Sequence, residues 1–446
     1  MYNHTENCSQ KRKGNRFETF RARVRVFGVL AGILTGAWLA HATAEPNSPF
    51  KPLSVFAQAL SELETRYVDS IDSEKLVRGA IQGMLDSLDP HTEYLDKDEY
   101  QTLRADTEGA FAGIGVEVAM RDGWLTVLNV FDNGPAAKAG LEPGDRFLKI
   151  ADEPARDIRM HEAVTKMRGR PGTSVKVLIR RQGVQQNLAL NITRATIHVD
   201  PVTFRFFSHD IAMVQIRSFQ SNTARELQTA LDEAVDRSDG KRGLRGLILD
   251  LRNNGGGLLR QAVLVSDMFV PSGEIVSTRG RGDVLLESFR AHGLGTRPSW
   301  PMVVLVNAQT ASAAEIVAGA LSDSGRAFVI GERTFGKGTV QEVIELLDGS
   351  AMKVTIAKYF TPAGRSIQAQ GIEPDLVIAE ASDNPDELIR EEDLEGHLRA
   401  AKKSSSTERK LTRSVAIDAN LAVPTAIADD AQAAAAYRWL RQRSAN

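Results

Sequence analysis

The sequence contains very little cysteine: Cys8 is the only one among 446 residues. It lies in an N-terminal segment that we expect to be removed. The mature chain would then carry no thiol, which excludes cysteine catalysis, disulfide bonds and metal sites built from cysteine. An exported protein without disulfides fits a bacterial periplasm.

An excess of charge of either sign is also missing. Lysine and arginine together number 55, aspartate and glutamate 57, and the formal net charge is −2. Without a basic excess nothing argues for a nucleic-acid partner, and without an acidic excess nothing argues for general disorder. The hydrophobic content of 42% is enough for two or three domains, each with its own core.

Two widespread catalytic patterns are missing as well. The sequence has no G-x-S-x-G elbow and no H-E-x-x-H motif, and no dense cluster of ligating side chains suggests a metal. Histidine is the usual catalytic base, yet none of the mature chain's histidines lies in a small-residue motif: His91, His161, His198, His209, His292 and His397. Three of them, His198, His209 and His292, could still reach a site in the fold. We place His91 in a helical segment, and we expect neither a metal nor a cofactor.

The N-terminus has the composition of a secretory signal. Seven basic residues between Lys11 and Arg25 precede an uncharged apolar stretch over residues 26–40, and Ala42-Thr43-Ala44 supplies an A-x-A cleavage site. This pattern predicts a signal peptide over residues 1–44 and a periplasmic protein. An uncleaved membrane anchor is the alternative, because the apolar stretch is only slightly shorter than the about 20 residues that a span needs.

Hydrophobic periodicity divides the rest of the chain into four regions. Apolar residues at helical spacing predict a helical region over 45–107, with one helix ending near Pro90. Short β-rich runs between glycine and proline turns, with short helices at 135–140 and 160–167, predict a compact α+β domain over 108–195. Alternating buried strands and helices predict an α/β domain over 196–380. Residues 381–446 are predicted to form an exposed linker around Ser404–Ser406 and a terminal helix, so the fold class is multidomain α/β.

The stretch GERTFGKG, residues 331–338, nearly matches the phosphate-binding pattern G-x-x-x-x-G-K-[ST]. Gly338 replaces the hydroxyl that would bind Mg²⁺, and residues 340–346 are strand-like where a P-loop needs a helix, so we reject a nucleotide site. Two flanking glycines allow close backbone packing and can direct Lys337 into a partly dry cleft. Burial lowers the pKa of a lysine, and a neutral lysine is a general base. A surface lysine in a glycine turn is the alternative.

A base needs a nucleophile, and Ser312 is the candidate. It lies between the predicted buried strand 303–306 and the predicted helix 313–321, at a helix N-terminus whose N–H groups carry partial positive charge. Three glycines, Gly255-Gly256-Gly257, follow another predicted buried strand, and N–H groups without a nearby Cβ suit a developing oxyanion. An ordinary N-cap serine and a tight turn are the alternatives.

Together these motifs resemble those of the carboxyl-terminal processing peptidases, also called tail-specific proteases. The matching stretches follow the family order over nearly the whole mature chain: LDPHTEYL from Leu88, AFAGIGVEV from Ala110, LDLRNNGGG from Leu249, TASAAEIVAGAL from Thr310 and GERTFGKGTVQ from Gly331. In the family the nucleophilic serine precedes the lysine by 25 positions, as Ser312 precedes Lys337 here.

The resemblance also implies roles for other side chains. The corresponding positions are Gln341, which would orient the lysine, Gly256 and Ala313, which would supply oxyanion N–H groups, and Asp323, Thr334 and Glu315, which would support the site. The chain departs from the family pattern at Ala314, often a second serine, and at Gly255, often proline. The second departure leaves open which glycine N–H binds the oxyanion.

By the same resemblance the β-rich domain is a PDZ domain, with Gly113-Ile114-Gly115-Val116 as its carboxylate-binding loop. PDZ grooves add an extended peptide as a strand and capture its terminal carboxylate on backbone N–H groups. Small residues at Gly113 and Gly115 leave such N–H groups free for an anion. The domain would select substrates by their C-termini or gate the site.

The sequence thus predicts an exported serine endopeptidase that cleaves proteins near their C-termini with a Ser312–Lys337 dyad. The resemblance implies self-association through the terminal helices, so a homo-oligomer is expected, and an activating adaptor protein is a possible further partner. The alternative from another class is an inactive PDZ scaffold that only binds protein C-termini.

Overall fold

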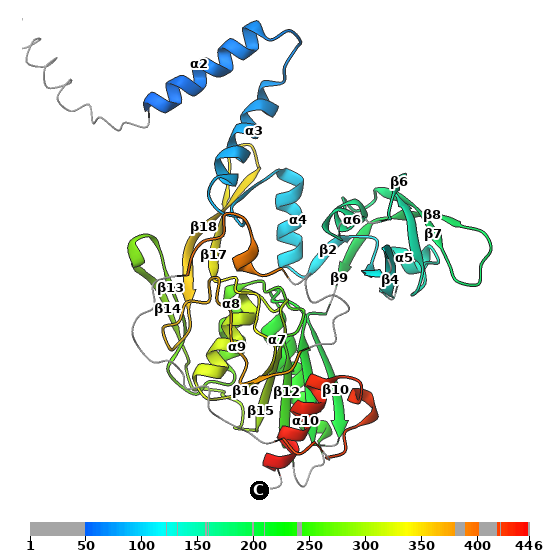
Figure 1. Ribbon diagram of the computed structural model, residues 1–446, viewed down its shortest axis with the longest axis vertical. Helices are drawn as coiled ribbons and strands as arrows, with labels where there is room; N and C mark the ends of the chain where they lie inside the picture. Colours follow the sequence, from blue (N-terminus) through cyan, green and yellow to red (C-terminus); the bar gives the residue numbers. More distant parts are fainter. Residues whose placement is uncertain are drawn as a thin grey trace, which may run out of the picture. The chain divides into compact units, whose positions relative to one another are not determined.

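The computed structural model describes residues 50–379, 389–400 and 417–444, apart from 122, 132, 157, 159, 199, 209, 239–242 and 420 (Figure 1). The predicted signal peptide and the predicted linker around Ser404–Ser406 lie outside the described residues. Within the described ranges, no helix combines the length and the apolar character that crossing a membrane requires. The chain divides into two compact units, residues 1–80 and 81–446, and each is described by itself.

The N-terminal region is helical only in part. Helix α2 spans Phe50–Arg66 and α3 spans Ser73–Asp86, but a turn and a short strand, β1 (Glu93–Leu95), interrupt the predicted helical run. Pro90 explains the interruption, because the residue before a proline disfavours helical backbone. The chain becomes helical again in α4 (Lys97–Thr107), where Asp96 caps the first turn and Glu99 completes a capping box. Placing His91 in a helix was therefore wrong: it lies in the turn before β1.

The small β domain has one antiparallel sheet and its own core. The sheet has the order β3-β4-β5-β7-β8, with β6 paired to β5. Its elements are β3 (Val116–Arg121), β4 (Trp124–Val130), α5 (Pro135–Lys138), β5 (Arg146–Ile150), β6 (Glu153–Pro154), α6 (Met160–Met167), β7 (Ser174–Arg180) and β8 (Leu188–Thr193). Leu125, Phe147 and Ile179 are fully buried in its core. Strands β2 (Ala110–Gly113) and β9 (Ala195–His198) pair antiparallel, so the chain enters and leaves the domain side by side.

A largely parallel sheet forms the centre of the α/β domain. Its order is β10-β11-β12-β15-β16-β19, and only the β10–β11 pair is antiparallel. The strands are β10 (Val202–Ser208), β11 (Ile211–Ile216), β12 (Gly246–Asp250), β15 (Met302–Val306), β16 (Phe328–Gly331) and β19 (Leu376–Val377). Every residue of β12 and β15 is buried, as expected for strands covered on both faces.

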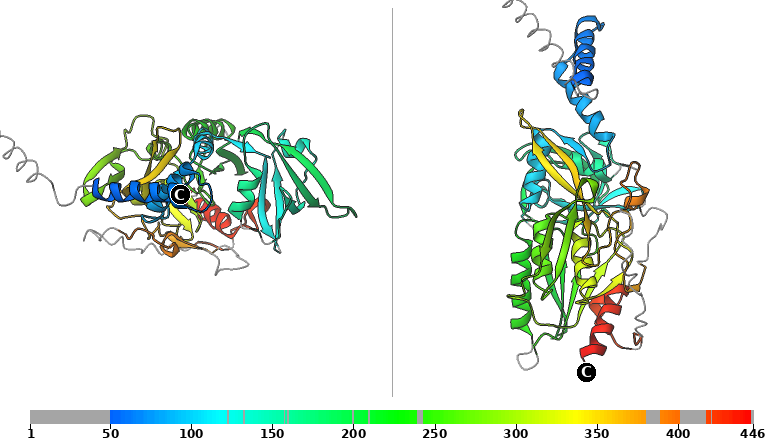
Figure 2. Two further views of the ribbon diagram at one scale, coloured as in Figure 1. Left: turned by 90° about the horizontal axis from the view of Figure 1, so that it is seen from above. Right: turned by 90° about the vertical axis from the view of Figure 1, so that its left-hand side faces the viewer.

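Helices cover the two faces of this sheet unequally. Alternate strand residues such as Leu247 and Leu249 pack with α7 (Thr223–Arg237), α8 (Leu259–Asp267) and α9 (Ala313–Asp323). The intervening residue Ile248 packs with α10 (Ala431–Ser444) on the other face (Figures 1 and 2). Successive side chains of a β-strand point to opposite faces of the sheet, which accounts for this division.

The terminal helix α10 is part of the α/β core. Tyr437, Trp439 and Leu440 are buried, and the Trp439 ring stacks on Phe328 of β16 with a centroid separation of 5.0 Å. These apolar side chains are covered within one chain and do not offer a surface for a second copy. The expectation that the terminal helix mediates self-association stays a prediction, and these buried side chains would not form its contact surface.

A second, antiparallel sheet was not predicted as a unit. Its order is β1-β18-β13-β14, with β17 also paired to β18. The strands not yet given are β13 (Glu274–Arg279), β14 (Leu285–Arg290), β17 (Thr339–Glu345) and β18 (Ala351–Phe360), and short 3-10 turns are η1 (Arg281–Asp283), η3 (Glu391–Asp393) and η4 (Thr425–Ile427). This sheet joins the turn that contains His91 to the strand that follows Lys337.

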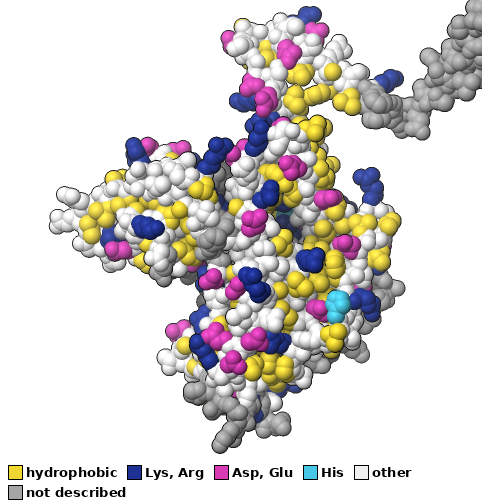
Figure 3. Space-filling model, turned by 180° about the vertical axis from the view of Figure 1, so that it is seen from behind, with side chains coloured by type: hydrophobic (Ala, Val, Ile, Leu, Met, Phe, Trp, Pro, Cys, Tyr) yellow, Lys and Arg dark blue, Asp and Glu magenta, His cyan; other side chains and the backbone are white. Residues whose placement is uncertain are grey.

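Acidic and basic side chains are interspersed over the described residues of the face drawn in Figure 3. This distribution agrees with the small formal net charge of −2.

Candidate active site

Ser312 lies at the N-terminus of α9, directly after the loop that follows β15. Its backbone is left-handed, with φ 54° and ψ −117°. An ordinary N-cap residue has extended backbone, and a non-glycine residue in this region is strained by about 1–3 kcal/mol. The backbone thus distinguishes Ser312 from a plain cap, and such strain is typical of functional positions.

The glycine-rich loop after β12 packs directly against Ser312. A Cβ at Gly256 would come within 2.8 Å of the Ser312 Cβ and 2.9 Å of the Ala311 carbonyl oxygen, so only glycine fits. Asn254, fully buried, holds the two loops together: its carbonyl oxygen accepts from the Ala311 N–H at 2.9 Å. Its side-chain Oδ1 also accepts from the Gly256 N–H at 2.8 Å, so this N–H already has a partner.

Glu315 joins two loops: the serine loop, residues 307–312, which contains Ser312, and the lysine loop, residues 332–338, which contains Lys337. Its carboxylate is completely buried and accepts four hydrogen bonds. Oε1 accepts from Thr334 Oγ1 at 2.5 Å and the Gly336 N–H at 2.7 Å, and Oε2 accepts from the N–H groups of Ser312 at 2.8 Å and Lys337 at 2.9 Å. The backbones of the predicted nucleophile and the predicted base therefore share one acceptor atom. Burial raises the pKa of Glu315 to about 8, and these four bonds oppose the shift.

Lys337 lies in the loop between β16 and β17 and is half-buried. Both flanking glycines are needed: Gly336 has φ +97°, and a Cβ at Gly338 would come within 2.1 Å of the Gln368 backbone nitrogen. Burial is the main cause that lowers the pKa of Lys337, and the nearby charge of Lys353 lowers it further. A lowered pKa is what a lysine needs in order to serve as a base near neutral pH.

Gln341 lies on β17 close to this loop. Its amide nitrogen donates to Thr339 Oγ1 at 2.8 Å and to Thr355 Oγ1 at 3.4 Å. Its donors are thereby directed to strand residues, and its amide oxygen is the atom suited to accept from an ammonium.

Asp323 is not brought into this group. It is the last residue of α9, whereas Ser312 precedes the first, and eleven residues of helix correspond to about 16 Å. Its carboxylate accepts from Arg365 Nη2 at 2.6 Å and the Ala363 N–H at 3.1 Å, so it anchors the turn after β18.

The predicted carboxylate loop belongs to the small β domain. Gly113 ends β2, Ile114 is buried, Gly115 has φ +79°, and Val116 begins β3. A Cβ at Gly115 would come within 3.0 Å of Ile197 Cδ1, so the tight backbone path depends on glycine.

Sequence reasoning missed a polar network beneath the lysine loop. Its hydrogen bonds connect Glu391 with His91 and with Gln368, which follows β18. His91 lies in the turn between α3 and β1, called the first turn below, and Glu391 lies in the segment 389–400, called the tail. The motif LDPHTEYL was recognised, but its side chains were given no role because the segment was read as helix. Charged residues near 391 looked like a solvated stretch, and nothing local distinguishes Glu391 from its neighbours.

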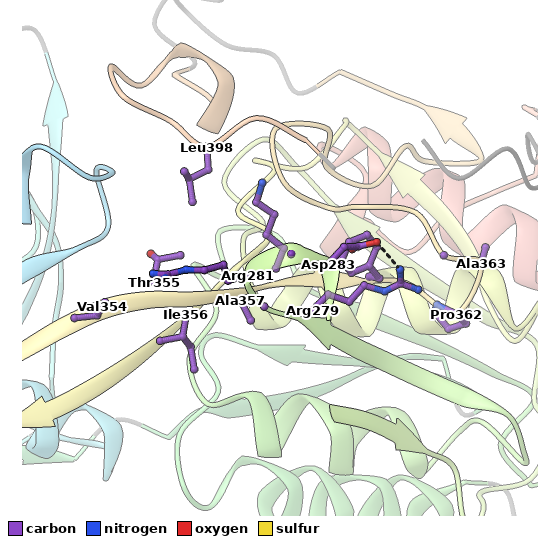
Figure 4. A pocket seen from close by; sticks show the side chains of 15 residues that line it. Arg279, Arg281, Asp283, Val354, Thr355, Ile356, Ala357, Pro362, Ala363 and Leu398 are labelled. Atoms are coloured by element: carbon purple, nitrogen blue, oxygen red, sulfur yellow. Dashed lines mark hydrogen bonds and ion pairs between the residues drawn. The ribbon is translucent and has the colours of Figure 1, made fainter. Parts of the chain in front are cut away.

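A cavity of about 1310 Å³ lies beside β18. Ile356 and Ala357 of β18, Arg279 of β13 and Leu398 line it, and Arg279 pairs with Asp283 across its rim (Figure 4). Thr355, which also lines the cavity, donates to Asp89 and accepts from Gln341. The cavity thus adjoins the hydrogen-bond network of the lysine loop.

Comparison with known proteins identifies the family. The model of peptidase family S41 matches residues 210–378, the PDZ domain model matches 112–192, and the model of the activating protease CtpB N-terminal domain matches 36–99. The chain is 38% identical over 426 residues to a carboxy-terminal-processing protease of Bartonella bacilliformis, covering 94% of this chain and 96% of that protein. It is 39% identical over 320 residues to the carboxy-terminal processing protease CtpA of Bacillus subtilis, covering 72% of this chain and 67% of that protein.

Among solved structures, a photosystem II D1 C-terminal processing protease is similar, with 32% identity and a TM-score of 0.49, covering 73% of this chain and 92% of that chain. The predicted fold class, with a helical N-terminal segment, a PDZ domain, an α/β protease core and a terminal helix, is confirmed. The chain belongs to the carboxy-terminal processing proteases of peptidase family S41 and is a serine-type peptidase.

Proposed function

We propose that the protein cleaves polypeptides near their C-termini with a Ser312–Lys337 dyad. The observation that carries the proposal is the shared carboxylate of Glu315, which holds the backbones of both residues on one oxygen. A serine hydroxyl is a weak nucleophile until an adjacent base removes its proton. Lys337, whose pKa is lowered by burial, is the base.

The reaction then proceeds in two halves. Neutral Lys337 takes the proton from Ser312 Oγ as that oxygen attacks the scissile carbonyl. The resulting ammonium returns the proton to the leaving amine, and the C–N bond breaks to leave an acyl-enzyme. Water then loses a proton to Lys337 and attacks the ester carbonyl; the bond from the acyl carbon to Ser312 Oγ breaks, and Lys337 returns the proton to that oxygen.

The oxyanion formed in each half is assigned to backbone N–H groups beside Ser312. Ala313 is the first residue of α9, and the N–H groups of a first helical turn have no intrahelical partner. Gly256 contacts Ser312, but its N–H donates to Asn254 in this structure, so it has to exchange this acceptor for the oxyanion. In this proposal the amide oxygen of Gln341 would accept from the Lys337 ammonium and keep it directed at Ser312.

The PDZ domain is assigned to the recognition of substrate C-termini. Strand β3 is the last strand of its sheet and pairs only with β4 in the order found, which leaves one edge for an added peptide strand. The loop Gly113–Val116 lies at the start of that edge, where a terminal carboxylate would meet backbone N–H groups.

The proposed location of the enzyme rests on the sequence. A signal peptide over residues 1–44 would export the chain, and exported proteins would be its substrates in the periplasm. Self-association is assigned to the N-terminal helix α2, in which Leu53, Phe56 and Leu63 are exposed.

Cleavage of quenched fluorescent casein by the purified chain tests the proposal. Ser312→Ala should abolish cleavage while leaving the thermal unfolding transition in place. Ser324→Ala, at the other end of α9, is the matched control and should cleave at the wild-type rate. Retained cleavage by Ser312→Ala would refute the dyad, and binding of a tailed peptide without cleavage by the wild type would favour the inactive scaffold.

A further inference from the structure

The carboxylate of Glu391 is buried at the start of η3 with two partners. Its exposed fraction is 0%. Its Oε2 lies 2.7 Å from His91 Nε2, and its Oε1 accepts from Gln368 Nε2 at 2.7 Å. Burying a carboxylate is costly unless it is paired and hydrogen-bonded, so these partners fix its place. Although burial opposes ionisation, the bonds from His91 and Gln368 hold the pKa of Glu391 below its usual value.

These bonds extend to the loop that carries Lys337. Gln368, itself fully buried, accepts from the Gly338 N–H through Oε1 at 2.9 Å. The Glu391 N–H donates to the Phe335 carbonyl oxygen at 3.1 Å. The lysine loop is thus held from the tail at residues on both sides of Lys337.

Arg390 adds a further attachment to the same loop. Its Nη1 donates to the carbonyl oxygens of Arg333 at 2.6 Å and Thr334 at 3.0 Å. The tail between 390 and 398 therefore packs on the lysine loop, and Leu398 contributes its carbonyl oxygen to Gln368 at 3.0 Å.

The charges that act on Lys337 come from four elements. Asp89 belongs to the turn after α3, Glu93 to β1, Lys353 to β18 and Glu391 to η3. The three carboxylates favour the ammonium, whereas Lys353 and burial favour the neutral amine. His91 in the same turn pairs with Glu391, and Glu93 pairs with Lys353 at 2.7 Å.

We propose that Glu391 is a positioning residue for Lys337. It fixes the lysine loop through Gln368 and its own backbone, and it places a negative charge near the ammonium that forms when Lys337 takes the Ser312 proton. His91 holds this carboxylate from the N-terminal side, so the tail and the first turn act on the base together. The inference rests on the proposed dyad for its catalytic meaning.

Two substitutions of Glu391 separate the effect of its negative charge from the effect of its position. Glu391→Gln keeps the shape: its amide oxygen can accept from Gln368 and its amide nitrogen can donate to neutral His91. Glu391→Asp keeps the charge but withdraws the carboxylate by one methylene, so it cannot reach both partners. Glu395→Gln, the same change at an exposed position of the same tail, is the matched control.

The titration of Lys337 is measured without turnover, in the Ser312→Ala background. Its reaction with acetic anhydride is followed by mass spectrometry over a pH series. Glu391→Gln should move the lysine titration to lower pH, and Glu395→Gln should leave it unchanged. In the Ser312 enzyme, Glu391→Asp should lower kcat for fluorescent casein on the order of 10²-fold with KM unchanged, because a misplacement of about 1 Å has that effect.

These outcomes test the positioning role of Glu391 independently of the proposed dyad. An unchanged Lys337 titration in folded Glu391→Gln, or wild-type kcat in Glu391→Asp, overturns the proposal. If Glu391→Gln does not fold, kcat of Glu391→Asp decides. Cleavage by Ser312→Ala would refute the dyad, whereas the lysine titration would still report on Glu391.

Discussion

Replacing Glu315 by glutamine tests how the loops that contain Ser312 and Lys337 are held together. The carboxylate accepts two hydrogen bonds on each oxygen, and three of the four donors are backbone N–H groups. A glutamine side chain keeps the shape but has only one acceptor oxygen. The glutamine amide can take two orientations. In the better one its oxygen accepts from the N–H groups of Ser312 and Lys337, and its nitrogen donates to Thr334 Oγ1 but lies opposite the Gly336 N–H, which also is a donor.

One buried N–H then loses its acceptor, which costs about 1–3 kcal/mol. We expect Glu315→Gln to lower the free energy of unfolding by this amount. Displacement of the lysine loop by about 1 Å would also lower kcat on the order of 10²-fold. The urea-unfolding midpoint and the cleavage of fluorescent casein measure the two effects. Glu345→Gln, exposed at the end of β17, is the control and should change neither.

The stability difference between the two chains should depend on pH. Because the folded-state pKa of Glu315 is raised to about 8, the folded wild type binds a proton that the unfolded chain has released. The wild type therefore loses stability as pH rises from the ordinary glutamate value of about 4.3 toward 8, whereas the glutamine variant does not. The stability difference between the two chains should narrow over this range and then reverse, because a loss of about 1.36 kcal/mol per pH unit exceeds a difference of about 1–3 kcal/mol before pH 8 is reached. A variant as stable and active as the wild type at all pH values would refute the reasoning.

Three further substitutions test other parts of the site. Lys337→Met should abolish cleavage. The wild type should also gain stability relative to this variant as pH rises toward about 10.4, because Lys337 releases its proton at a lower pH in the folded chain than in the unfolded chain. A stability difference that does not change with pH would contradict this. Gly338→Ser completes the P-loop pattern, but its Cβ would meet the Gln368 backbone nitrogen at 2.1 Å, so we expect loss of cleavage and no ATP binding by calorimetry. Ile356 lines the cavity beside β18, and if substrate binds there, Ile356→Trp should raise KM for casein several-fold. Ile344→Trp, at a position that is also 40% exposed, should leave KM unchanged, and equal KM values for the two variants would exclude the cavity as a substrate-binding site.

Local patterns were sufficient to locate the strand–loop–helix that carries Ser312. The buried run before it appears as β15 and the small-residue segment after it as α9. Such elements depend on hydrophobic spacing within a few residues, which a single sequence displays. The left-handed backbone of Ser312 is different, since it results from Glu315 and Asn254 acting on the loop from two sides.

Long-range pairing explains what the sequence did not reveal. Strand β1 pairs with β18 across more than 250 residues, from Glu93 to Lys353, and His91 meets Glu391 across 300. Neither contact leaves a local pattern, because register between distant strands depends on the assembled sheet. The short strand β1 was not predicted, because it pairs with a distant strand and the segments on both sides of it have helical spacing.

The convergence of distant segments on Lys337 follows from what a lysine base has to do. In the proposed dyad, Lys337 would have to be neutral to take the Ser312 proton and charged immediately afterwards, so neither form could be strongly disfavoured. Burial and Lys353 favour the neutral form, and Asp89, Glu93 and Glu391 favour the charged one. A loop of seven residues, 332–338, cannot contain both influences and still pack closely between Glu315 and Gln368. The opposing charges are therefore supplied by the segment that contains Asp89 and Glu93, by β18 and by Glu391, so the charge state of Lys337 depends on segments that are far apart in the sequence.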